Sequence, residues 1–278
     1  MLATPIVAIL GGVLIGIRSG VSAAAFAPNL IGVLLGGMTF LLVRRRGAAL
    51  SRLAPIIAVL ALLLMALTVS LPGIDGVRRW LTVGPLAVNV SAVFAPWLLW
   101  AIYVFRGKAA ASVALAVGVS IIHVLQPDAG QATAFGCAAI VLFALSTSAG
   151  RLSSVLGCAT TLLGIVMAWR RADPLASVDH VERILHLAVD AGPPLTITAF
   201  FGLVLLLVPM VFVAFGAARS QQRWLAASLA TYTLAGIAAT ELGHFPVPVI
   251  GAGAGPVLGW YGAIAALAAS SEAGLPLP

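Results

Sequence analysis

The sequence contains few charged residues and few cysteines. Only 8% of its 278 residues are Asp, Glu, Lys or Arg, and 62% are hydrophobic, whereas a soluble domain carries about 25% charged residues. A soluble globule of this length could not cover its surface with so few charges. The composition therefore excludes a soluble enzyme, a nucleic-acid-binding module and a disordered chain. Both cysteines, Cys137 and Cys158, lie in apolar runs, which argues against a disulfide framework or a cysteine metal site.

Several signatures of soluble enzymes are also absent. The chain has no phosphate-binding Walker loop, no dinucleotide-binding glycine pattern, no His/Cys metal-ligand spacing and no serine nucleophile elbow. The net charge of +7 does not indicate a nucleic acid partner, because the 15 basic residues lie mostly in short gaps between apolar runs. Long apolar segments dominate what is present.

Apolar segments of about 17 to 25 residues predict transmembrane helices. Arg, Pro, Gly and Asp residues divide the chain into about ten such segments, so we predict an all-α polytopic transmembrane bundle, formed by residues 1–278 as a single integral membrane domain. The predicted spans are 3–17, 26–43, 53–71, 86–105, 109–125, 131–148, 152–169, 195–215, 224–242 and 249–270. The first has no basic region before it, so we interpret it as a helix and not as a signal peptide.

The Lys and Arg residues of short loops predict the orientation in the membrane. One set of loops, which includes Arg44–Arg46, carries nine basic residues, and the other set carries six. This bias places the first set and both termini in the cytoplasm. All acidic residues except Glu272, and all four histidines, then fall at the outer face. Because ionisable groups near the bilayer mark function, we expect any chemistry there; the alternative is that outer loops simply hold the longer polar segments.

Two adjacent arginines, Arg78 and Arg79, precede Trp80 in one outer loop. Two guanidiniums can bind a phosphate or diphosphate through bidentate hydrogen bonds. The alternative is an interfacial anchor, in which the tryptophan ring and the arginines bind lipid headgroups without specificity.

A second outer segment contains Gln126, Pro127, Asp128 and Gly130. Proline ends the preceding helix and glycine allows a tight turn. Asp128 is expected to cap the following helix at its N-terminus, which would make its role structural.

The outer loop 170–194 is predicted to contain a short amphipathic helix at the membrane interface. Its polar residues recur at helical spacing: Asp179, Glu182 or Arg183, His186 and Asp190. A carboxylate on this stripe can act as a general base, with basic residues binding an anion nearby. The alternative is a solvated polar face without chemistry.

The segment 241–255 combines two prolines with several glycines between two spans. Irregular backbone at membrane depth is tolerated only where it is buried in protein or lines a wet cavity. Gly251, Gly255 and Gly259 recur at every fourth residue, as in close helix packing, so packing alone is the alternative explanation.

Four of these segments, in this order, resemble the SEDS family of bacterial shape, elongation, division and sporulation proteins. The family patterns G-x-x-R-W-x-x-x-G, Q-P-D-x-G and P-x-P-x-x-x-x-G are matched by Gly76, Arg79, Trp80 and Gly84, by Gln126, Pro127, Asp128 and Gly130, and by Pro246, Pro248 and Gly253. The family's outer-loop pattern H-x-D-F-I, followed by an acidic residue and Gly, is represented by His180, Val181, Glu182, Arg183, Ile184, Asp190 and Gly192. The resemblance covers about residues 73–270.

The resemblance implies a multi-pass protein of the bacterial cytoplasmic membrane that polymerises lipid II, a lipid-linked disaccharide precursor, into peptidoglycan strands. Glu182, or less favourably Asp179, would be the catalytic base. The diphosphate leaving group would be held by Arg79, Arg78, Arg170 and Arg171. Structural or orienting roles would fall to Trp80, Gln126, Pro127, Asp128, Gly130, His180, Pro246, Pro248 and Gly253. No cofactor or metal site is identified, and a divalent cation is left open. The family implies a single-span class B penicillin-binding transpeptidase as partner, for cell shape or division.

The chain also departs from the family. The first motif normally continues as P-S-E-x-x-K, and only Ser91 of that continuation is present. Glu182 replaces an aspartate, and the outer loop is much shorter. These departures motivate an alternative: a non-catalytic protein of the same fold that binds a lipid-linked precursor or scaffolds a cell-wall complex. A transporter is less favoured, because the middles of the spans carry almost no charge.

Overall fold

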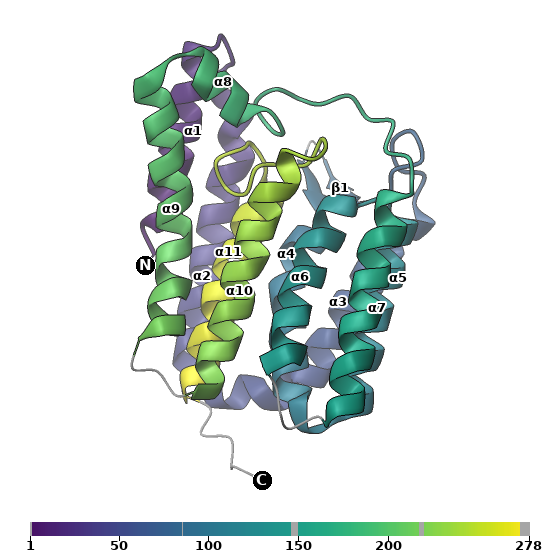
Figure 1. The fold of residues 1–278 in the computed structure, drawn as a ribbon. Coiled ribbons are helices and arrows are strands. Elements are labelled where there is room, and N and C mark those ends of the chain that lie inside the picture. The colour runs from purple at the N-terminus through teal and green to yellow at the C-terminus, as the bar shows by residue number, and fades with distance from the viewer. Residues whose placement is uncertain (1, 85, 146–149, 217–219, 273–278) are drawn as a thin grey trace.

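The computed structural model describes residues 2–84, 86–145, 150–216 and 220–272, which form a bundle of eleven α-helices (Figure 1). The helices are α1 (Thr4–Arg18), α2 (Ala27–Leu50), α3 (Ala54–Ser70), α4 (Val90–Val104), α5 (Ala109–Leu125), α6 (Ala129–Leu145), α7 (Arg151–Trp169), α8 (Ile184–Asp190), α9 (Pro193–Phe215), α10 (Ser220–Thr240) and α11 (Ala254–Glu272). Short 3₁₀ turns lie at Ala23–Phe26, Ser51–Leu53 and Phe105–Gly107, and the strands β1 (Trp80–Val83) and β2 (Leu86–Asn89) form a hairpin.

The all-α prediction of a membrane bundle is confirmed at the level of fold. Each of the ten predicted spans coincides with one of the ten longer helices. Within the described ranges, five helical segments are long and apolar enough to cross a membrane: Ala23–Arg46, Ser51–Ser70, Val90–Gly107, Arg151–Trp169 and Pro193–Phe215. Large apolar side chains cover the outside of the bundle, as expected of a surface that faces lipid.

The number of crossings and the side of the termini stay predictions. Helix α1 has 15 residues, which gives about 22 Å at 1.5 Å per residue, less than the ~30 Å of a bilayer core. Its N-terminal end lies partway along the bundle in Figure 1. The end of the predicted span 131–148, together with Met1 and residues 273–278, lies outside the described residues.

Helices α4 and α11 form the centre of the bundle. In α4, 67% of the span is buried, against 22–33% in the other four long apolar segments. Small residues allow the two central helices to approach closely. A Cβ atom on Gly259 would lie 2.0 Å from the Ala92 carbonyl oxygen, and one on Gly255 would lie 3.0 Å from the Asn89 carbonyl oxygen. This part of the glycine stripe therefore serves packing.

The predicted span 86–105 is too long at its N-terminal end, because residues 86–89 form β2 and the helix begins at Val90. The strands pair antiparallel, with Trp80 opposite Asn89, around a turn in which Gly84 has φ +58°. The side chain of Asn89 then accepts a hydrogen bond from the Ala92 N–H at 2.9 Å. This N-cap explains why the helix starts there.

The outer loop contains α8, but this helix begins only at Ile184. The predicted helical stripe is therefore wrong for Asp179 and Glu182, which lie in turns before the helix. Within α8, Ile184 and Ala188 are buried, and the helix packs against α9 and α1. His186 lies with its Nε2 3.9 Å from a Glu241 carboxylate oxygen.

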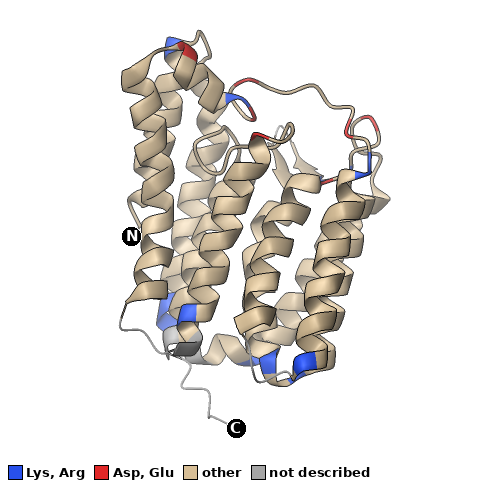
Figure 2. Ribbon diagram, in the orientation of Figure 1, with Lys and Arg blue, Asp and Glu red and all other residues tan. Residues whose placement is uncertain are grey.

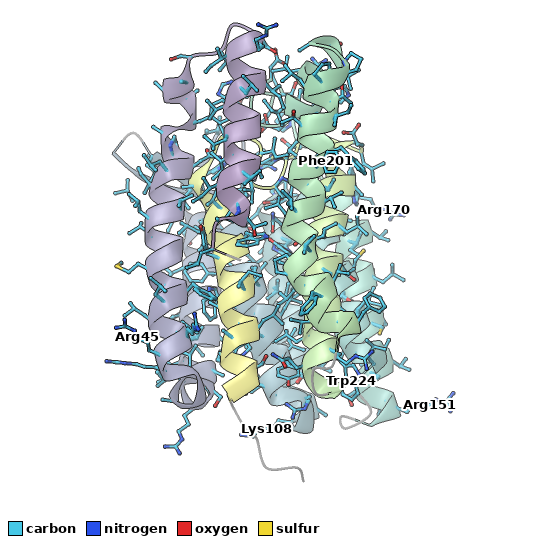
Figure 3. The ribbon with its side chains drawn as sticks, turned by 90° about the vertical axis from the view of Figure 1, so that its left-hand side faces the viewer. Arg45, Lys108, Arg151, Arg170, Phe201 and Trp224 are labelled. Atoms are coloured by element: carbon cyan, nitrogen blue, oxygen red, sulfur yellow. The ribbon has the colours of Figure 1, made fainter. Side chains whose placement is uncertain are left out.

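The two ends of the bundle differ in their charged residues. In Figure 2 the red acidic residues lie at the upper end together with several blue lysine or arginine residues, whereas the coloured residues at the lower end are all lysine or arginine. In Figure 3, Arg45, Lys108 and Arg151 lie toward the lower end, and Arg170 lies at the opposite end of α7 from Arg151. Under the positive-inside rule, this asymmetry is the pattern expected for the predicted orientation, which stays a prediction.

Candidate functional site

Four segments that are distant in sequence meet at the upper end of the bundle. The backbone N–H of Arg78 donates to the Gln126 carbonyl at 3.3 Å, which joins the loop before β1 to the α5–α6 turn. The N–H of Val247 donates to the Val181 carbonyl at 3.0 Å, and that of Ala252 donates to the His180 carbonyl at 2.9 Å. The loop 241–253 is therefore tied to the turn that carries Glu182.

Arg79 is the centre of a buried ion cluster. Its side chain is 3% exposed and forms an ion pair with Asp173, while its Nη1 lies 3.7 Å from a carboxylate oxygen of Asp128. The guanidinium lies 4.8 Å from the centre of the Trp80 ring and 5.6 Å from that of Phe245. Among the described atoms, its Nε has no hydrogen-bond partner. One cation and two carboxylates leave the cluster with excess negative charge.

Asp128 is fixed from three sides. It caps α6 by accepting a hydrogen bond from the Gln131 N–H at 3.1 Å, and it accepts another from Asn89 Nδ2 at 3.0 Å. Its third contact is Arg79, and its side chain is 2% exposed. Asp128 therefore both caps α6 and positions the Arg79 guanidinium.

Gln126 and Gly130 hold the same turn in place. The Gln126 side chain donates to Thr68 Oγ1 at 2.7 Å and accepts from Ser91 Oγ at 2.8 Å, so it joins α3 to α4. A Cβ atom on Gly130 would lie 2.5 Å from the Phe245 ring. Pro127, between them, has φ +31° and lines a cavity of about 190 Å³ at the protein surface.

Glu182 is half-buried beside this cluster. Its carboxylate accepts a hydrogen bond from the Val178 N–H at 2.6 Å. Burial raises the pKa of Glu182, and the opposing effects include the positive charges of Arg79 and His244. The carboxylate is therefore within electrostatic reach of the buried guanidinium, and its raised pKa suits a group that takes up a proton.

The other predicted ligands divide into two groups. Arg171 lines the 190 Å³ cavity together with Asp173 and His244. Arg78 is exposed, and its Nη1 donates to the Val69 carbonyl at 3.0 Å. Arg170 points away from the bundle in Figure 3. Asp179 is exposed and pairs with Arg183 at 3.6 Å. The structure thus brings Arg79, Arg171 and Glu182 into one region. It leaves the predicted residues Arg78, Arg170 and Asp179 at the edge of that region.

The remaining matched residues shape the loop behind Glu182. His180 packs against the ring of Phe26, with centroids 6.2 Å apart. Pro246 and Pro248 line a separate cavity of about 40 Å³ in the bundle, which has room for about three waters. Gly253 has φ +152°; its N–H donates to Asn29 Oδ1 at 2.7 Å.

Asn29 and Asp173 are site residues that the sequence reasoning missed. Asn29 is fully buried, and its Nδ2 also donates to the carbonyls of Val249 and Gly251 at 3.0 and 2.9 Å. A polar amide inside the apolar run 26–43 was the available signal. Asp173 lies outside the polar stripe predicted for the loop 170–194, and nothing in its spacing points to Arg79. Among the described side chains, no three His, Cys, Asp or Glu gather as metal ligands.

The bundle has a SEDS-like membrane fold. The crystal structure of the rod shape determining protein RodA of Thermus thermophilus matches with a TM-score of 0.69 and 19% identity, covering 97% of this chain and 93% of RodA. A mutant of that RodA matches with a TM-score of 0.68 and 20% identity, covering 98% and 93% of the two chains.

A chain of a peptidoglycan synthase complex that coordinates polymerization and crosslinking also matches. Its TM-score is 0.68 at 18% identity, with 98% of this chain and 97% of that chain covered. No protein-family model matches the sequence, and no curated protein matches it. At these identities the comparisons show the fold, and the resemblance to SEDS proteins is confirmed at that level.

Proposed function

We propose that the protein is a glycosyltransferase that polymerises lipid II into peptidoglycan strands at the outer face of the bacterial cytoplasmic membrane. One observation carries the proposal: within a RodA-like fold, the half-buried Glu182 belongs to a turn that is hydrogen-bonded to the loop 241–253, and Phe245 of that loop lies 5.6 Å from the buried Arg79 guanidinium. A base and an anion-binding cation are the two groups that glycosyl transfer from a lipid diphosphate requires.

In this reaction Glu182 accepts the proton of the acceptor sugar hydroxyl. The hydroxyl oxygen bonds to the anomeric carbon of the donor, and the bond from that carbon to the diphosphate oxygen breaks. The leaving diphosphate carries the negative charge away, and Arg79 and Arg171 would stabilise it. Asp128 positions Arg79, and Asp179 stays the less favoured base because its carboxylate is exposed and paired with Arg183.

The partner of the proposed reaction is a single-span class B penicillin-binding transpeptidase, which would crosslink the strands. Support comes from one structural neighbour, which is a component of a peptidoglycan synthase complex. The basic lower end of the bundle supports an orientation with the candidate site outside the cytoplasm.

A second candidate function is a non-catalytic protein of the same fold that binds a lipid-linked precursor or scaffolds a cell-wall complex. Two contacts favour it: Arg79 is already paired with two carboxylates, and the Glu182 carboxylate is engaged by the Val178 N–H. Both groups would have to exchange these contacts for substrate before chemistry.

A gel-based lipid II polymerisation assay separates the two candidates. Purified full-length protein is assayed alone and with a co-expressed class B transpeptidase, after its folded state is verified by thermal melting. The proposal expects glycan strands in at least one of the two conditions. Folded protein that binds lipid II but produces no strands in either condition would favour the non-catalytic function.

A further inference from the structure

We infer that Asp173 is an internal competitor for the lipid diphosphate: its carboxylate occupies the Arg79 guanidinium in the substrate-free state and must leave it when the diphosphate binds. This inference rests on the proposed function, because it takes Arg79 as the diphosphate ligand. It adds a regulatory contact to that site, formed by the outer segment between α7 and α8.

The two carboxylates at Arg79 are held very differently. Asp128 belongs to the first turn of α6 and has the N-cap bond and the Asn89 bond in addition to Arg79. Asp173 belongs to an irregular segment, and its one further bond among the described residues is local, from the Leu175 N–H at 3.2 Å. The Asp173 side chain is 19% exposed, against 2% for Asp128. Asp128 is therefore the fixed partner of Arg79, and Asp173 is the exchangeable one.

The segment that carries Asp173 can move at low cost. Residues 172–178 have no helix or strand, and they pass over the upper end of the bundle between α7 and α8 (Figure 1). Between 172 and 177, the described backbone makes no hydrogen bond to another backbone group. Segments with few backbone bonds open locally at a small fraction of the global unfolding free energy. Withdrawal of Asp173 therefore does not require any helix to unfold.

Space and charge for a diphosphate lie beside this contact. The 190 Å³ cavity is lined by Asp173, Arg171, His244 and Phe245, and it far exceeds the ~10–15 Å³ that one water needs. With Asp173 in place, two carboxylates face the Arg79 guanidinium. With Asp173 withdrawn, one of these two negative charges is removed and one side of the guanidinium loses its ion-pair partner. A diphosphate would then replace the displaced carboxylate with phosphate oxygens, which accept the same charge-assisted hydrogen bonds.

The contact between Asp173 and Arg79 therefore weakens the apparent affinity of the protein for a diphosphate. A ligand that binds only the open state has its dissociation constant raised by the inverse of the open fraction. If Asp173 is paired with Arg79 in about nine molecules in ten, removal of this contact strengthens diphosphate binding by about tenfold. Substitution of Asp173 should therefore improve binding, whereas loss of a purely structural ion pair would leave binding unchanged or weaken it.

The experiment is equilibrium binding of geranylgeranyl diphosphate to full-length protein in nanodiscs, with inorganic pyrophosphate as the headgroup-only probe. Asp173→Asn removes the competing charge at nearly constant volume, and Asp173→Glu restores a carboxylate. Asp75→Asn is the matched control: it removes the same charge from an exposed residue at the same end of the bundle. Its φ of +49° suits asparagine as well as aspartate.

The expected result is binding about tenfold tighter in Asp173→Asn, with Asp173→Glu and Asp75→Asn close to the wild type. Unchanged or weaker binding by folded Asp173→Asn would overturn the inference, as would no binding to any variant. Tighter binding in Asp173→Asn without glycan strands from any variant would support the inference while the proposed polymerase activity fails, so the two failures are distinguishable.

Discussion

Replacement of Asn29 by leucine should loosen the loop that lies behind Glu182. Asn29, in the first turn of α2, makes hydrogen bonds to the carbonyls of Val249 and Gly251 and to the N–H of Gly253. Leucine has nearly the same size and offers none of these bonds. Three backbone groups of a buried loop would lose the partner that the structure gives them.

The magnitude follows from the cost of such groups. A buried polar group left without a partner costs about 1–3 kcal/mol, while interhelical side-chain hydrogen bonds in a membrane protein average about 0.6 kcal/mol. For three bonds, these figures bracket a loss of roughly 2–9 kcal/mol. At about 2–4 °C per kcal/mol, the melting temperature should fall by at least about 4 °C.

Two assays check this prediction. Thermal melting in detergent gives the stability change, and hydrogen exchange by mass spectrometry reports the peptide 249–253, in which Gly253 loses its acceptor. Thr39→Val is the matched control in α2, because the Thr39 hydroxyl bonds its own helix at the Leu35 carbonyl and no other group among the described residues. It should change stability by no more than about 0.5 kcal/mol. An Asn29→Leu protein that melts with the wild type and exchanges no faster at 249–253 would refute the reasoning.

Two further predictions concern the same end of the bundle. Gly130→Ala places a Cβ atom 2.5 Å from the Phe245 ring, so it should destabilise the protein by about 1–3 kcal/mol through overpacking, measured as a lower melting temperature; Gly37→Ala, at a helical glycine with open space, is the control and should not lower it. Because burial raises the pKa of Glu182 above the ordinary 4.5, and the base works only when deprotonated, the acidic limb of the polymerisation rate should lie above that value. His244→Gln removes a charge that lowers this pKa, so the limb should move to higher pH; a shift to lower pH would contradict the assignment.

The helices could be predicted from the sequence because apolar runs of bilayer length leave few other folds open. The start of α4 could not, since the apolar residues Leu86–Val88 continue the apolar run of the helix. Only the pairing of residues 86–89 with β1 and the N-cap formed by Asn89 show that the strand ends, and the helix begins, at this point. The start of α8 was missed for a related reason: helical spacing continues back to Asp179, but the 178–183 turn is tied to the loop 241–253.

The motif residues indicated which segments matter, but not which side chains meet. Arg78 and Arg79 are adjacent in sequence, and in the segment before β1 they face opposite environments, one exposed and one buried. The partner of Arg79, Asp173, is 94 positions away, and Asn29 contacts a loop more than 200 positions away. Spacing rules describe neighbours within one helix or strand, so contacts of this kind require the folded structure.

The most direct test of the proposed function is the lipid II polymerisation rate of Glu182→Gln relative to Glu241→Gln. Both substitutions remove one carboxylate at the outer end of the bundle, but Glu241 is 54% exposed and its contact is with His186. Loss of a general base costs about 10²–10⁴-fold in rate. The account predicts a loss of this size in Glu182→Gln and a rate near that of the wild type in Glu241→Gln. Equal rates in wild type and folded Glu182→Gln would contradict it.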